Sequence, residues 1–125
     1  MKCCLLFAVL ACLLSGEELK APARLIFISR SADGVKFNPP LVKVWAGDTI
    51  HWRNTTGELH EPGVLNEKGG FVPFQDAPIA AHSGSHIFSP MPRLNADKKQ
   101  IEFEIHYHCR KHPGEQGTIK VQPTP

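Results

Sequence analysis

The residues best able to bind a metal ion lie near the carboxyl end of this 125-residue sequence, where the segment from His106 to His112 reads HYHCRKH. Two residues separate Cys109 from His112. A short loop with this spacing can bring a thiolate and an imidazole to one ion. On spacing alone, a buried and inert Cys109 beside a surface His112 is an equally open interpretation.

A third candidate ligand is His60, which follows an apolar strand-like segment and could approach from a second sheet. One thiolate and two imidazoles on a rigid β scaffold are the ligand set of a type 1 copper site. Structural zinc sites use four protein ligands and usually more cysteines, so a single thiolate favours copper. We therefore expect one copper ion, cycling between Cu(I) and Cu(II), at His60, Cys109 and His112.

The elements that must position these residues are predicted to be strands. Eleven prolines and ten glycines punctuate short apolar runs, and no window has the apolar repeat of a helix. The expected strands are residues 24–31, 40–45, 48–54, 70–74, 83–89, 100–109 and 118–121. Seven to eight short strands in about 100 residues predict an all-β, Greek-key sandwich or barrel. A tight hairpin-type turn is expected at residues 46–48.

Side-chain alternation in residues 100–109 separates a core face from a solvent face. The predicted core face is apolar and consists of Ile101, Phe103, Ile105, Tyr107 and, at the strand end, Cys109. The predicted solvent face consists of Glu102, Glu104, His106 and His108. Cys109 is therefore expected to point inward.

Residues 1–23 are typical of a secretory signal peptide, with one early Lys, an apolar run over residues 3–14, and small residues after it. That run is too short for a transmembrane helix, which needs about 20 residues. We expect cleavage between residues 16 and 23, and a single periplasmic or secreted domain over 24–125 with no transmembrane segment. An alternative is a lipoprotein signal with Cys12 as the lipidated residue.

The net charge and the positions of the cysteines limit the possible partners and disulfides of the mature chain. The net charge is +2, and residues 1–23 contain equal numbers of acidic and basic residues, so the remaining chain has no dense basic stripe. This argues against nucleic acid as a partner. Three of the four cysteines precede residue 13, so the mature chain keeps only Cys109 and forms no intramolecular disulfide.

Two motifs resemble the cupredoxin family. The segment from Phe37 to Asn54 resembles its pattern of a strand, Gly-Asp-Thr, and an apolar-x-Trp-x-Asn strand, and His60 follows at the place of the first copper histidine. Residues 107–113 with 117–121 are similar to the copper loop and last strand of plastocyanin-like and amicyanin-like members. The resemblance implies an eight-stranded Greek-key sandwich, type 1 copper, and one-electron transfer between redox proteins. We expect a monomer and no enzyme activity.

The sequence departs from the family at two places. Glu115 stands where the weak axial ligand, usually Met, is found, and such a carboxylate would lower the reduction potential. Gln116 as the axial ligand, or a three-coordinate copper with Glu115 in solvent, are the alternatives. Glu61 stands at the place of an Asn that tethers the two ligand loops, so the resemblance carries no tether onto Glu61.

Two other functions are compatible with these residues. One is a periplasmic copper carrier or sensor. The other is a nitrosocyanin-like copper site that acts on a small molecule. We expect an electron carrier.

Overall fold

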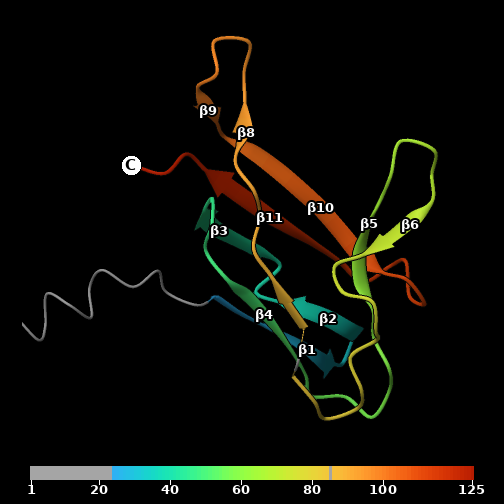
Figure 1. The fold of residues 1–125 in the computed structure, drawn as a ribbon. Helices are drawn as coiled ribbons and strands as arrows, with labels where there is room; N and C mark the ends of the chain where they lie inside the picture. The colour runs from blue at the N-terminus through green and yellow to red at the C-terminus, as the bar shows by residue number, and fades with distance from the viewer. Residues whose placement is uncertain (1–23, 85) are drawn as a thin grey trace, which may run out of the picture.

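The computed structural model describes residues 24–84 and 86–125, and the predicted signal peptide lies outside the described residues (Figure 1). The described part contains eleven strands and no helix, which confirms the all-β prediction. They are β1 (Arg24–Ser31), β2 (Gly34–Asn38), β3 (Leu41–Trp45), β4 (Ile50–Asn54), β5 (Pro62–Leu65), β6 (Phe71–Pro73), β7 (His86–Phe88), β8 (Arg93–Leu94), β9 (Gln100–Ile101), β10 (Phe103–Cys109) and β11 (Gln116–Gln122). No helix of residues 24–84 and 86–125 is therefore long and apolar enough to cross a membrane.

The strands form two main sheets. The first has the order β2-β1-β4-β7, with β1 parallel to β4, and the second has the order β3-β11-β10-β5-β6, with β3 parallel to β11. Strands β8 and β9 pair in a separate hairpin. Non-consecutive strands lie side by side in both sheets, as the predicted Greek-key sandwich requires.

The structure differs from the expected strands in four places. It adds β2, β5 and β8, and it interrupts the expected strand 100–109 at Glu102. Strands as short as β8, with two residues, carry too little apolar alternation to be recognised in a sequence.

The turn between β3 and β4 is a correction, because it does not form a hairpin. β3 pairs with β11 and β4 pairs with β1, so this turn carries the chain from one sheet to the other. The buried Asp48 stabilises the turn, since its Oδ2 accepts a hydrogen bond of 2.8 Å from the backbone N–H of Trp45.

The core lies between the two sheets and is built from the inward-facing residues of both. Trp52 of β4 and Tyr107 of β10 are its largest fully buried side chains. Their rings meet edge to face at a centroid distance of 5.6 Å, and Trp52 Nε1–H donates to Tyr107 Oη at 3.4 Å. Burial raises the pKa of the Tyr107 phenol well above its usual range. This aromatic contact joins the two sheets two residues before the end of β10.

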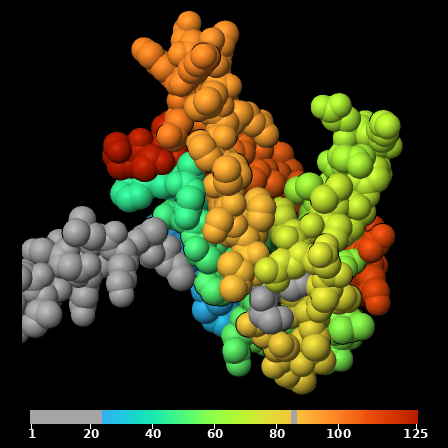
Figure 2. Space-filling view, in the orientation of Figure 1, coloured from blue at the N-terminus to red at the C-terminus, as the bar shows by residue number. Residues whose placement is uncertain are grey.

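Two arms extend beyond this core. Figure 2 shows the β5–β6 hairpin and the β8–β9 hairpin standing out from the body of the molecule. Leu65 and Leu94, one on each arm, are more than half exposed. These two side chains lie outside the core, whereas the start of β5 pairs with the end of β10 and Val64 packs against the core.

Candidate metal centre

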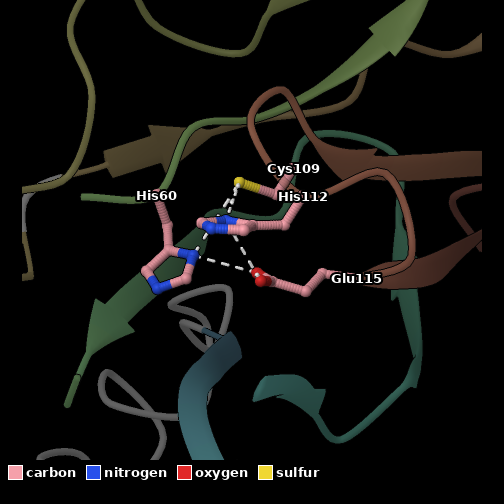
Figure 3. A group of neighbouring side chains, drawn as sticks. All are labelled: His60, Cys109, His112 and Glu115. Atoms are coloured by element: carbon pink, nitrogen blue, oxygen red, sulfur yellow. Dashed lines mark hydrogen bonds and ion pairs between the residues drawn. The ribbon is translucent and has the colours of Figure 1, made fainter. Parts of the chain in front are cut away.

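The structure brings the four predicted ligands, His60, Cys109, His112 and Glu115, to one place (Figure 3). One donor atom from each lies within 4.8 Å of the others. Cys109 Sγ is 3.8 Å from His60 Nδ1 and 3.6 Å from His112 Nδ1. The Glu115 carboxylate places one oxygen 2.9 Å from His60 Nδ1 and the other 3.2 Å from His112 Nδ1. Such a group could hold a metal ion.

The end of the β10–β11 hairpin supplies three of these residues. Cys109 is the last residue of β10 and Glu115 immediately precedes β11. The backbone N–H of Cys109 donates to Glu115 O at 3.1 Å, and that of Glu115 donates to His112 O at 2.9 Å. These two bonds set the spacing between the thiol, the imidazole and the carboxylate.

His60 comes from the segment that links β4 in the first sheet to β5 in the second. It forms an isolated bridge with Ile79, with two backbone hydrogen bonds of 3.2 and 2.7 Å. Both residues are completely buried. The bridge therefore fixes the His60 backbone although no regular strand contains it.

Glu61 ties the His60 segment to the Cys109 segment, a role that the family resemblance did not carry over. Its backbone N–H donates to Cys109 Sγ at 3.4 Å, and its carbonyl accepts from the backbone N–H of Arg110 at 2.9 Å. Its buried carboxylate also pairs with Arg110 Nη1 at 3.2 Å. The tether is thus present, with a Glu–Arg ion pair beside the backbone bonds.

Burial shifts the pKa values of the His60 imidazole and the Glu115 carboxyl, which face each other in the cluster. It lowers the pKa of the His60 imidazole, and the charge of His112 acts in the same direction. It raises the pKa of the Glu115 carboxyl, which His112 partly opposes. Both shifts mean that an isolated charge is unfavourable here.

One buried oxygen atom of the cluster has no hydrogen-bond partner. Glu115 Oε1 accepts no hydrogen bond, although His60 Nδ1 lies 2.9 Å away. Buried polar side-chain atoms are paired in the large majority of cases. A cation between the donors would satisfy this oxygen together with the thiolate and both imidazoles, so the residues fit a bound metal.

The exposed edge of the cluster is His112, whose side chain is 36% exposed, whereas those of His60 and Glu115 are almost fully buried. Its Nε2 lies 3.6 Å from a carboxylate oxygen of Glu58. Glu58 in turn pairs with Arg30 at 2.9 Å. The exposed side of His112 therefore lies next to the Glu58–Arg30 ion pair.

The alternative ligand Gln116 is exposed, and its side-chain amide donates to Pro113 O at 3.4 Å. It therefore does not belong to the cluster.

Sequence analysis missed the residues behind the ligands, chiefly Thr56, whose Oγ1 lies 2.9 Å from His60 Nε2. The one local signal is Asn54, because an Asn side chain commonly bonds the backbone N–H two residues further on, as it does here with Thr56 at 2.9 Å.

Comparison with known proteins gives similarity in structure only. No protein-family model matches the sequence, and no curated protein is significantly similar to it. The crystal structure of amicyanin from Paracoccus versutus is 20% identical, with a TM-score of 0.58, over 85% of this chain and 87% of that chain. A reduced Cu(I) form of an amicyanin mutant is 19% identical, with a TM-score of 0.58, over 85% of this chain and 88% of that chain. The chain therefore has the all-β sandwich fold of the cupredoxins.

Proposed function

We propose that this protein is an extracytoplasmic mononuclear copper protein that carries single electrons between redox partners. The observation that supports it is the convergence of His60, Cys109, His112 and Glu115 at the end of a cupredoxin-type sandwich. A single thiolate with two imidazoles is the donor set of copper electron-transfer sites. The signal-like residues 1–23 support the extracytoplasmic location.

Copper bound in this site would supply one-electron exchange, and the chain's own residues would keep the cost of that exchange low. The His60–Ile79 bridge, the Cys109–Glu115 backbone bond and the Glu61–Arg110 pair hold the segments that carry the donor atoms. Donors that are held in place cannot move far when the charge of the ion changes. We infer that little structural reorganisation accompanies each electron.

His112 is the contact point for a redox partner, because it is the only one of the four side chains with substantial exposure. Arg110 and Lys111 are exposed beside it. A partner with an acidic docking patch fits these two cations, although Glu58 and Arg30 add charges of both signs to the same rim.

Glu115 is proposed as the fourth ligand. Its carboxylate is 8% exposed, and its two oxygens face the two histidines. Thiolate and carboxylate together balance the charge of Cu(II) but leave a net negative charge with Cu(I). We therefore expect a reduction potential lower than that of the same site with a neutral axial ligand.

The absorption spectrum of the copper-loaded protein tests the proposal. We expect an intense visible sulfur-to-copper charge-transfer band, a reversible one-electron couple, and loss of the band in Cys109→Ser. If copper binds without that band, or with equal strength in Cys109→Ser, the thiolate is not a ligand and the proposal is wrong. A band without a reversible couple would favour a copper carrier or sensor.

One observation favours a second candidate, a copper site that acts on a small molecule. Glu115 also lines a surface hollow of about 350 Å³ between β1, β2 and the β10–β11 turn. If the Glu115 carboxylate moved aside, a small ligand in this hollow could reach the coordination position that the carboxylate would leave on the metal. Azide or nitric oxide should then shift the charge-transfer band. A site in which Glu115 stays bound would give no response.

A further inference from the structure

The ring nitrogen of His60 that faces away from the cluster lies against buried polar side chains. Its Nε2 is 2.9 Å from Thr56 Oγ1, which is 2.7 Å from Asn54 Oδ1. The exposed fraction of each of these three residues is 4% or less. Because all three residues are buried, the direction of each hydrogen bond follows from the protein groups that each one contacts.

The amide of Asn54 sets the first direction. Its Nδ2 lies 2.6 Å from Glu58 O, 3.1 Å from Ala80 O and 3.4 Å from Ile79 O. Backbone carbonyls only accept hydrogen bonds, so the NH₂ group must face them, and a flipped amide would set oxygen against oxygen. The Asn54 oxygen therefore faces Thr56, where it accepts from the backbone N–H at 2.9 Å and from Oγ1 at 2.7 Å.

The hydroxyl of Thr56 sets the second direction. It has one proton, and the short contact with Asn54 Oδ1 takes it, since that oxygen cannot donate. The other carbonyl within reach, Glu58 O at 3.4 Å, would also take a proton from the hydroxyl. In either arrangement Thr56 can only accept from His60, so the ring carries its proton on Nε2.

We propose that Thr56, directed by Asn54, is a positioning residue that holds His60 in the tautomer whose bare Nδ1 faces the metal. The inference rests on the proposed copper site, but the tautomer itself needs no metal. The bare Nδ1 then faces Cys109 Sγ at 3.8 Å and Glu115 Oε1 at 2.9 Å, which belong to two of the other proposed ligands. Partners behind a ligating histidine commonly set its tautomer and ring orientation.

The first test reads the His60 ring directly, by ¹⁵N-edited NMR of the metal-free protein at neutral pH. We expect the proton on Nε2 and none on Nδ1. A proton on Nδ1 in the unaltered protein overturns the inference. It would leave the proposed function intact if copper still binds with a sulfur-to-copper band.

The second test compares three variants for tautomer and for Cu(II) affinity by chelator competition. Thr56→Val removes the hydroxyl at similar volume, and we expect mixed tautomers and about 10- to 100-fold weaker Cu(II) binding. Thr56→Ser keeps the hydroxyl and should behave like the unaltered protein. Thr55→Val is the matched control, because Thr55 Oγ1 bonds Ile28 O at 2.8 Å and does not touch His60.

The outcomes separate the two proposals. Thr56→Val with unchanged tautomer and affinity, or an equal loss in Thr56→Ser or Thr55→Val, overturns the positioning role. If Thr56→Val does not fold, Thr56→Ala replaces it with the same expectations. Failure of the unaltered protein to bind copper would remove the proposed function, while the NMR result would still decide the tautomer.

Discussion

This protein has two groups of histidine and carboxylate side chains, and only one of them brings its donor atoms together at one place. His60, Cys109, His112 and Glu115 are gathered from a bridge, a strand end and a turn, within 4.8 Å. No other group of three or more His, Cys, Asp or Glu side chains among residues 24–84 and 86–125 could hold a metal in this way.

The contrasting group is the outer face of β10, which carries Glu104, His106 and His108. Alternate residues of one strand point the same way but are about 6.6 Å apart along it. His106 accordingly uses its two nitrogens separately, Nε2 at 3.3 Å from Glu104 and Nδ1 at 3.3 Å from Thr118. Its side chain is 73% exposed, so water competes for both contacts. Ligand types alone do not make a site; segments of different origin must bring them together.

The largest expected difference between the two groups is in copper affinity. His60→Ala should weaken Cu(II) binding by more than about 100-fold, because it removes a donor and not merely an outer partner. His106→Ala should leave binding unchanged. Chelator competition measures both. If the two variants lose similar affinity, the convergent cluster is not the copper site.

A second contrast concerns the two glycines on either side of Glu115 and its neighbour Gln116. Gly117 pairs with Tyr107 across the ladder, and a Cβ added there would collide with the Tyr107 ring, which is buried and cannot retreat. We expect Gly117→Ala to lower the free energy of unfolding by about 2–3 kcal/mol. Gly114→Ala is the control, since a Cβ at Gly114 meets nothing within 4 Å. Denaturant unfolding that finds the two variants equally stable would contradict this packing.

Glu115 and Glu104 allow the same comparison for the carboxylates. Glu115→Gln removes a negative charge beside the ion, which weakens Cu(II) binding relative to Cu(I) and raises the reduction potential. The expected rise is about 60 mV for each tenfold change in relative affinity. Glu104→Gln should not alter the potential. An unchanged potential and spectrum in Glu115→Gln would show that the carboxylate is not a ligand.

The smallest expected effect separates a buried ion pair from an exposed one. Glu61→Gln removes the charge of a carboxylate that is 7% exposed and pairs with Arg110, and it should cost about 1 kcal/mol, since Arg110 itself is 57% exposed. Asp33→Asn disrupts the exposed pair with Lys36 and should cost less than about 0.5 kcal/mol. Equal thermal stabilities of the two variants would argue against a structural role of the Glu61 tether.

Much of the fold follows from local alternation. The strand predicted over 24–31 is β1 itself, and in β10 the buried Tyr107 and Cys109 point inward as expected while Glu104 and His106 are exposed. Apolar alternation reveals such strands because one face of each must be buried. It does not reveal strand pairing, so it predicts a hairpin at the turn after β3, whereas this turn connects the two sheets.

The sequence by itself determined an all-β chain, the inward direction of Cys109, and the donor types available for a soft, redox-active metal, because these depend on residue type and on the two-residue period of a strand. Tertiary structure alone decided that His60 meets Glu115, that Glu61 reaches Arg110, and that the Asn54 amide faces the carbonyls of Ile79 and Ala80. These contacts join residues of different segments through side-chain geometry. Their distances are set by how the two sheets pack, which no local pattern in the sequence expresses.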